Sequence, residues 1–244
     1  MEVSVNNNEP VALSEYVIDA VHFDPEKIKK GAILLFDKPE NWSSFRLVKK
    51  VRHFSKAVKV GHAGTLDPLA TGLLVLCTGK CTKMIDRIQV MEKTYTGTFY
   101  VGKTTPSFDL ETEFDAEYPI DHITDDLIDA AVKSLTGEID QVPPVFSAIK
   151  INGTRAYEHA RKGREIEMSS RKVKIHDFRV WGYLPELQFE VSCSKGTYIR
   201  TLAQDFGQKL GSGACLTKLR RTKIGMFHVD HAFKIEEFQE LCGF

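Results

Sequence analysis

Residues 60–72 read VGHAGTLDPLATG and lead directly into the apolar run LLVL at 73–76. The glycines at 61, 64 and 72 allow positive φ and close approaches of the backbone. Pro68 keeps Asp67 out of the helical region, so the segment predicts a stiff loop that presents one carboxylate ahead of a buried strand. An aspartate placed in this way is equally typical of an ordinary turn and of a catalytic site.

Helix-like and strand-like patterns alternate irregularly along the chain, and no repeat or Gly/Ser-rich linker divides it. Apolar or alternating runs predict strands at 32–36, 73–76, 93–101, 173–181, 187–193 and 224–229. Caps and periodicity predict helices at 45–54 (apolar positions Phe45, Val48, Val51 and Phe54), 80–89, 124–135, 155–162, 198–210 and 235–241. We therefore predict a mixed α+β fold with a largely antiparallel central sheet flanked by helices. Residues 23–244 are expected to form one domain after a loosely ordered lead-in over residues 1–22.

Charge is segregated along the sequence, although 33 basic residues balance 33 acidic ones. Residues 43–66 contain six Lys or Arg and no acid, residues 214–224 contain four and no acid, and residues 147–184 contain nine against four acids. Residues 104–132 carry nine acids and no Lys or Arg. A zero net charge alone argues mildly against nucleic acid as a partner, whereas three basic segments favour an extended anionic partner over ordinary solvated faces.

The sequence also disfavours several classes of protein. It contains no run of about 18 to 20 apolar residues, and its first residues lack the features of a signal peptide, so we expect a cytoplasmic protein without membrane association. Five cysteines at spacings that match no zinc pattern indicate reduced structural thiols. The eight histidines do not cluster, and residues 73–78 are strand-like where a phosphate loop needs a turn, so neither a metal site nor a nucleotide loop is expected.

The loop at 61–72 resembles the signature of the TruB family of tRNA pseudouridine synthases. Further segments resemble that family in its order along the chain: Asp37-Lys38-Pro39 with Ser43-Ser44, Lys93-Thr94-Tyr95, Pro144 to Lys150, Ser194 to Thr201, and Leu219-Arg220-Arg221. The resemblance runs from about Gly31 to Val229 and implies the pseudouridine synthase fold, with a catalytic cleft across the sheet. It also implies isomerisation of uridine 55 in the T-loop of tRNA, in which uracil leaves the ribose at N1 and is rejoined through C5, with no cofactor and no metal.

The same resemblance implies a chemical role for three side chains. Asp67 is the catalytic carboxylate, acting either as a nucleophile or as a base at the ribose C2′. Arg200, in the first turn of the helix expected at 198–210, is its salt-bridge partner, and a neighbouring guanidinium favours an ionised carboxylate. Tyr95 stacks on the target base and is a candidate for the proton step at C5.

A uridine in a folded RNA loop must be flipped out before it can react. By resemblance, His62 fills or braces the space that the uridine leaves, and Leu219 and Tyr198 form walls of the base pocket. The remaining positions that match the family near the site or the RNA are Lys38, Pro39, Lys83, Asp109 and Lys150. The basic segments then correspond to the phosphate footprint.

The sequence departs from the family pattern at two places. Asn41 stands where the family often has glycine, although asparagine tolerates left-handed φ better than most residues. Thr105-Pro106-Ser107-Phe108 precedes Asp109 where many members carry Thr-Asp-Thr, which leaves the contacts of that loop open. An RNA-clamping insertion is expected at about 143–171, and the separate C-terminal RNA-binding domain of many members is not expected.

The expected partner is the T-arm of a tRNA, bound by a monomer that needs neither a guide RNA nor an obligate protein partner. Two alternatives stay open: the catalytic subunit of a guide-RNA particle, and a non-catalytic tRNA-binding or tRNA-folding module. The presence of Asp67, Tyr95 and Arg200 together favours catalysis over the second alternative.

Overall fold

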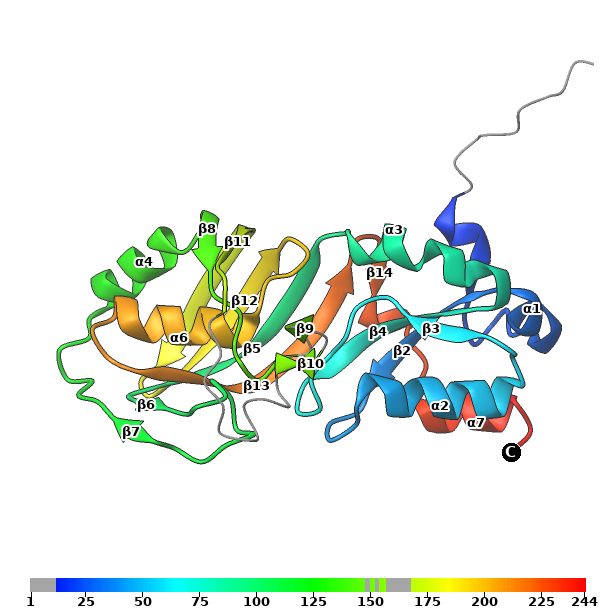
Figure 1. The fold of residues 1–244 in the computed structure, drawn as a ribbon, viewed down its shortest axis with the longest axis horizontal. Helices are drawn as coiled ribbons and strands as arrows, with labels where there is room; N and C mark the ends of the chain where they lie inside the picture. Colours follow the sequence, from blue (N-terminus) through cyan, green and yellow to red (C-terminus); the bar gives the residue numbers. More distant parts are fainter. Residues whose placement is uncertain (1–11, 148–149, 152–153, 157–167) are drawn as a thin grey trace, which may run out of the picture.

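The computed structural model describes residues 12–147, 150–151, 154–156 and 168–244. Within these residues the chain forms a ten-stranded sheet in the order β1-β2-β4-β13-β5-β12-β11-β8, with β3 paired to β4 and β14 paired to β13 (Figure 1). The strands are β1 (Val17–Ile18), β2 (Ile33–Lys38), β3 (Val60–His62), β4 (Thr71–Thr78), β5 (Lys93–Val101), β8 (Gly137–Gln141), β11 (Arg171–Tyr183), β12 (Glu186–Cys193), β13 (Ala214–Ile224) and β14 (Phe227–His228). Two smaller antiparallel pairs stand apart from it: β6 (Lys103–Thr104) with β7 (Ala116–Glu117), and β9 (Lys150–Ile151) with β10 (Thr154–Arg155).

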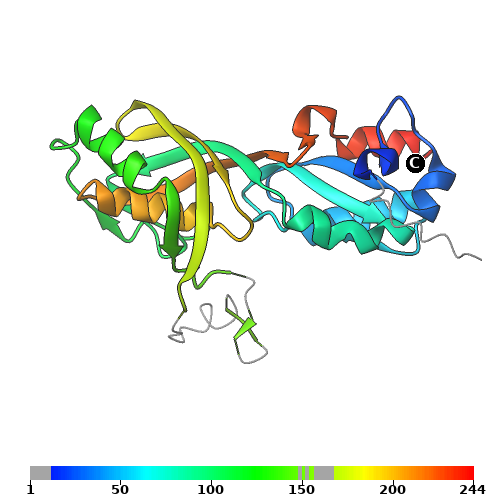
Figure 2. The ribbon, with the colours of Figure 1, turned by 90° about the horizontal axis from the view of Figure 1, so that it is seen from above.

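Helices flank this sheet, as the sequence predicts. The α-helices are α1 (Pro25–Lys30), α2 (Ser44–Ser55), α3 (Ile85–Gln89), α4 (Asp125–Ser134), α6 (Ile199–Lys209) and α7 (Ile235–Leu241), and the 3₁₀ helices are η1 (Leu13–Tyr16), η2 (Gly79–Met84) and η3 (Val229–His231). Helices α4 and α6 lie over the half of the sheet that ends at β8, and α2, α3 and α7 lie over the half that contains β2 and β4 (Figure 2). In the described part of the chain, no helix is long and apolar enough to cross a bilayer.

The two halves of the sheet meet at a narrow joint between β4 and β13. These strands run parallel and are paired at two positions, Thr71 with Arg220 and Gly72 with Arg221. Gly72 has φ 98°, and a Cβ there would lie 2.3 Å from the carbonyl oxygen of Arg221, so the contact requires glycine. From β13 to β8 every neighbouring pair of strands is antiparallel, which confirms the predicted largely antiparallel sheet.

The strands β2 and β4 are covered on both faces. Leu74 and Leu76 belong to a core cluster with residues of α2 and α7, whereas Leu73 and Val75 belong to a second cluster with residues of α3. A strand that is buried on both sides has no solvent face, so its apolar residues run without interruption. This explains why residues 73–76 are apolar at every position.

The other half of the sheet is packed through aromatic rings. Phe99 of β5 stacks on Phe189 of β12 at 4.1 Å between ring centroids, and Phe206 of α6 lies 5.4 Å from Phe99. All three rings are fully buried. This packing fixes α6 on the sheet and therefore fixes the turn before α6.

Three predictions about the fold are wrong. No strand was expected over Ala214–Ile224, yet β13 is the strand that links the two halves of the sheet. The strand expected at 224–229 is instead the last residue of β13, a turn, β14 and the first residue of η3. The lead-in was expected to be loose over residues 1–22, but Val17–Ile18 pairs with β2 and Ile18 is buried. Phe45 was expected among the apolar positions of its helix, but it is exposed, and Leu47 is buried in its place.

Two further expectations concern residues 143–171 and the turn at Asn41. The helix at 155–162 and most of the insertion at 143–171 lie outside them. Asn41 adopts φ 62°, so the turn survives the departure from glycine.

Candidate active site

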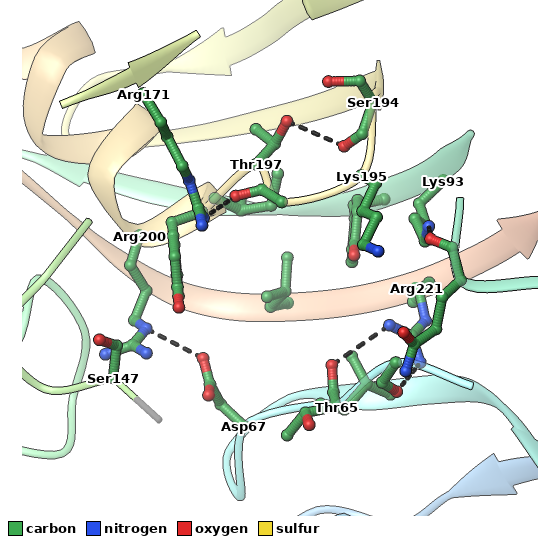
Figure 3. Close-up of a pocket in the computed structure, with 18 residues that line it drawn as sticks. Thr65, Asp67, Lys93, Ser147, Arg171, Ser194, Lys195, Thr197, Arg200 and Arg221 are labelled. Atoms are coloured by element: carbon green, nitrogen blue, oxygen red, sulfur yellow. Dashed lines mark hydrogen bonds and ion pairs between the residues drawn. The ribbon is translucent and has the colours of Figure 1, made fainter. Parts of the chain in front are cut away.

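A pocket of about 310 Å³ lies beside the joint between the two halves of the sheet. Its walls come from the loop before β4, from β5 and β13, and from the turn between β12 and α6 (Figure 3). The lining residues are 64–67, Gln89, Lys93, Tyr95, Ser147, Arg171, 194–200, Leu219 and Arg221. The fold thus brings together five of the predicted site residues, which are Asp67, Tyr95, Tyr198, Arg200 and Leu219.

The loop that carries Asp67 is tied down on both sides of the carboxylate. Before it, the Ser44 hydroxyl accepts from the Leu66 amide at 2.9 Å and donates to the Leu66 carbonyl at 3.0 Å. After it, the Pro68 carbonyl accepts from the Asn41 amide at 2.9 Å and from the Lys38 ammonium at 3.2 Å. The Asp67 side chain is held in this frame with 38% of its surface exposed.

Arg200 lies in the first turn of α6 and reaches the same carboxylate. Its Nε is 2.9 Å from Oδ2 of Asp67 and 3.5 Å from Oδ2 of Asp109, and its side chain is 4% exposed. Its terminal nitrogens donate to the carbonyls of Ser107 at 3.3 Å and Phe146 at 3.0 Å. Because backbone carbonyls hold the guanidinium, its position does not depend on Asp67 alone.

The loop that departs from the family pattern contributes to this arrangement. Ser107 supplies a carbonyl to Arg200, and its hydroxyl donates to the Asp109 carbonyl at 3.0 Å. Burial raises the pKa of the Asp109 carboxyl, and the neighbouring Arg200 opposes that shift. Asp109 therefore lies behind Arg200 as a second carboxylate of the site and does not line the main pocket.

Aromatic and apolar side chains form the opposite wall. Tyr95 is 8% exposed, and burial raises the pKa of its phenol, opposed by the charge of Arg221. Leu219 of β13 stands opposite Gly97 in the neighbouring strand, and its half-buried side chain packs against the core cluster while it lines the pocket. Tyr198 lies under the guanidinium of Arg171, whose Cζ is 4.7 Å from the ring centroid.

The backbone of Tyr198 is clamped by one buried amide. Gln141 of β8 donates to the Tyr198 carbonyl at 3.1 Å and accepts from the Tyr198 amide at 2.7 Å. Tyr198 is the N-cap of α6 and its own side chain makes no capping bond. Gln141 therefore fixes the turn that places Arg200.

Arg221 was not assigned a role from the sequence and proves central to the pocket wall. It is 1% exposed and donates to the carbonyls of Leu73 at 2.8 Å, Gly64 at 3.1 Å and Thr65 at 3.3 Å. These bonds connect β13 to β4 and to the loop just before Asp67. Four further residues line the pocket and were given no individual role from the sequence: Lys93, Ser147, Arg171 and Lys195.

Some predicted contacts with RNA lie elsewhere. Lys38 was expected near the site or the RNA; its side chain is fully buried, and its ammonium donates to the carbonyls of Pro39, Trp42 and Pro68. Burial lowers the pKa of Lys38 to about 8. His62 of β3 is half-buried beside the pocket lining, and burial lowers its pKa. Lys83 is exposed on η2, and the side chain of Lys150 is outside the described part of the chain.

The basic segment at 214–224 is largely used inside the protein. Arg220 makes two hydrogen bonds of 2.9 Å to the carboxylate of Asp37, and Arg221 is buried. Lys218 and Lys223 are the members that remain exposed. Among the described residues no cluster of three His, Cys, Asp or Glu side chains is placed to hold a metal ion.

The fold has a solved counterpart. A chain in the crystal structure of a Cbf5–Nop10–Gar1 complex matches it with a TM-score of 0.67 and 24% identity, over 93% of this chain and 64% of that chain. At that identity the likeness concerns the fold. The sheet and its flanking helices have the pseudouridine synthase fold, and the ion pair between Asp67 and Arg200 lies in a pocket at the joint of that sheet.

The family follows from direct sequence matches. The model of the N-terminal domain of TruB family pseudouridylate synthases matches residues 52–199, and that of the C-terminal domain of tRNA pseudouridylate synthase B matches residues 200–244. The chain belongs to the TruB family. It is 56% identical to tRNA pseudouridine synthase B of Flavobacterium johnsoniae over 88% of this chain and 98% of the relative. It is 49% identical to the protein of the same name from Phocaeicola vulgatus over 87% and 93%.

Proposed function

We propose that the chain isomerises uridine 55 in the T-loop of tRNA to pseudouridine, with Asp67 as the catalytic carboxylate. The observation that carries the proposal is the 2.9 Å ion pair between half-exposed Asp67 and buried Arg200 in a pocket that Tyr95 also lines. The relatives named tRNA pseudouridine synthase B support tRNA as the substrate.

The pocket has the size and walls for one flipped nucleoside. Its volume of about 310 Å³ is at the lower end of the range of about 300 to 1,000 Å³ for small-molecule sites. Tyr95 stacks on the uracil, and Leu219 packs against its edge. Because burial raises the pKa of Tyr95, the phenol contacts the base in its neutral form at physiological pH.

The proposed isomerisation uses side chains of this pocket. Asp67 acts on the ribose, by attack or by removing a proton from C2′, and the bond between N1 and C1′ breaks. The uracil turns in the pocket and C5 bonds to C1′, while the bond from Asp67 to C1′ breaks or, in the alternative, the proton is returned to C2′. C5 then loses a proton and N1 gains one, so atoms and electrons balance. Arg200 keeps the carboxylate in place through their ion pair.

The test is an assay of the purified protein on an unmodified tRNA transcript without guide RNA, with pseudouridine mapped by nucleotide. We expect pseudouridine at position 55 with the wild type and none with Asp67→Asn, because the amide cannot serve as nucleophile or base. Asp126→Asn, an exposed acid of α4 in the half of the sheet away from β4, is the matched control and keeps full activity.

The variant Arg200→Ala distinguishes two roles for Arg200: ion-pair partner of the Asp67 carboxylate, or contact to an RNA phosphate. It should lose at least about a hundredfold in turnover while tRNA binding changes little. Equal losses in binding and turnover would assign Arg200 to the RNA backbone. Product that forms only after a guide RNA or a protein is added, or tight tRNA binding with no product under any condition, would overturn the proposed function.

A further inference from the structure

We propose that the exposed face of α2 and the segment after it bind the phosphate backbone of tRNA outside the T-arm. This surface, the α2 face, is formed by Arg46, Lys49, Lys50, Arg52, Lys56 and Lys59. The inference rests on the proposed function because it takes tRNA to be the substrate. It adds a second region of contact, separate from the catalytic pocket.

The charges of the α2 face are exposed and uncompensated. All six side chains are exposed, and none forms an ion pair within the part of the chain that the structure describes. Other cations are paired with acids of the protein: Arg220 pairs with Asp37, and Arg179 pairs with Asp177 and Glu190. Segment 43–66 contains no acid at all, so the α2 face keeps its full charge for a partner.

Aromatic rings orient several of these cations without cancelling their charge. Arg46 lies 4.1 Å above the Trp42 ring, Lys49 lies 4.8 Å above the Phe45 ring, and Lys56 lies 4.4 Å above the Phe244 ring. A cation–π contact restrains a side chain but leaves its ammonium or guanidinium protons available to an anion. The α2 face is therefore partly ordered before any phosphate arrives.

The α2 face starts at the catalytic loop and extends away from it. Ser44, the first residue of α2, is bonded to Leu66 next to Asp67. Figure 1 shows α2 beginning near the middle of the molecule and running along its lower edge to the far end. With 12 residues at about 1.5 Å each, the helix is about 18 Å long. That length equals about five phosphate steps of a strand, more than one flipped nucleotide occupies.

The chemistry of the α2 face fits a nucleic acid better than a lipid surface. Apart from the exposed Phe45, the apolar side chains of α2, among them Leu47 and Val51, are buried in the core, so the helix has no continuous apolar face to insert into a bilayer. The charges recur along the length of α2 and in the segment after it, which suits a run of several phosphates. Since the T-arm must enter the pocket, the α2 face is left for an RNA segment beyond it.

The experiment compares two substrates with one triple variant. Lys49→Gln, Lys50→Gln and Arg52→Gln are introduced together, and binding and single-turnover rates are measured on a full-length tRNA transcript and on an isolated T-arm hairpin. The variant should bind the full tRNA about tenfold more weakly, with a salt dependence reduced by about two to three phosphate contacts. Its saturated rate on tRNA, and both parameters on the hairpin, should equal those of the wild type.

A second triple variant controls for a general loss of charge. Lys27→Gln, Lys29→Gln and Lys30→Gln remove the same charge from α1, whose three lysines are exposed at the far end of the molecule (Figure 1), and should leave tRNA binding unchanged. Equal weakening by the α1 variant would overturn the assignment to α2, and so would unchanged tRNA affinity in the α2 variant. Equal weakening on tRNA and hairpin would place the contact on the T-arm and overturn the proposal.

Two further outcomes test the type of partner and the proposed function. Wild-type binding to vesicles containing 30% anionic lipid, lost in the α2 variant while tRNA binding is kept, would show a membrane surface instead and overturn the proposal. Absence of pseudouridine with the wild type on either RNA would overturn the proposed function, whereas the binding comparison would still report on the α2 face. Thermal unfolding confirms that the α2 variant is folded, since its substituted side chains are exposed.

Discussion

Substituting Arg221 by lysine tests the claim that a buried cation positions the loop of the active site. The variant keeps the positive charge but replaces a planar donor with five N–H groups by a single ammonium. Arg221 donates to the carbonyls of Gly64, Thr65 and Leu73, which belong to the loop before Asp67 and to β4. Arg221 uses three separate nitrogens, Nε, Nη1 and Nη2, for these carbonyls, whereas lysine offers one nitrogen, so we expect two of the three carbonyls to lose their donor.

The magnitude follows from these bonds and from burial. Hydrogen bonds from a charged donor contribute about 1.5 to 3 kcal/mol each. Arg221 is 1% exposed, so water does not replace the lost donors. We therefore expect Arg221→Lys to lower the free energy of unfolding by about 3 to 5 kcal/mol. For a chain of this size that loss corresponds to a fall in Tm of roughly 10 °C. Displacement of Asp67 by about 1 Å would reduce turnover by about a hundredfold.

The assay combines urea unfolding with turnover and tRNA binding. Arg220→Lys is the matched control, because Arg220 is the neighbouring residue but pairs with Asp37 and has 39% of its side chain exposed. It should cost no more than about 1 kcal/mol. If Arg221→Lys unfolds at the wild-type urea concentration and instead weakens tRNA binding with an unchanged saturated rate, Arg221 is a phosphate contact and the reasoning fails.

Two further predictions concern buried charges. Lys38→Met should reduce turnover and lower the urea midpoint, while tRNA affinity stays at the wild-type value. The reason is that Lys38 donates to the Pro68 carbonyl beside Asp67 and does not reach the surface. Weaker tRNA binding alone would contradict this prediction. Burial raises the pKa of Asp205 from 3.8 to about 6, opposed by Lys209, so the unfolded state ionises first and stability falls as pH rises through that window. Asp205→Asn should therefore stabilise the protein by about 1 to 2 kcal/mol at pH 7.5, allowing for its partial exposure, and by clearly less at pH 4.5; an equal gain in urea unfolding at both pH values would refute it.

The parts of the fold that follow from sequence are those with a simple burial pattern. The strand β4 is apolar throughout because both faces are covered, and β5 alternates because one face is. The strand β13 was missed because its polar residues hide that pattern. Arg221 points inward and is satisfied by carbonyls of residues 148 to 157 positions earlier, a partnership that no local pattern encodes.

The candidate site shows the same division. Resemblance named Asp67, Tyr95 and Arg200, and the fold brings all three to one pocket. It did not reveal that Asp109 stands behind Arg200 at 3.5 Å, nor that Lys38 faces inward. A family motif identifies residues that are important, but it does not separate a residue that holds a loop in place from one that contacts RNA. Burial distinguishes them.

The basic segments illustrate why a count of charges is insufficient. Segments 43–66 and 214–224 look alike in sequence, since each is rich in Lys and Arg and free of acids. In the second, Arg220 meets Asp37 from 183 residues earlier and Arg221 meets backbone carbonyls, so half of its four cations stabilise the protein itself. In the first, the cations lie on α2, whose apolar side is in the core, and on the segment after it, and all six are exposed. A chain with zero net charge can therefore offer a strongly basic surface to RNA, provided that its remaining cations are used internally and its acids lie elsewhere.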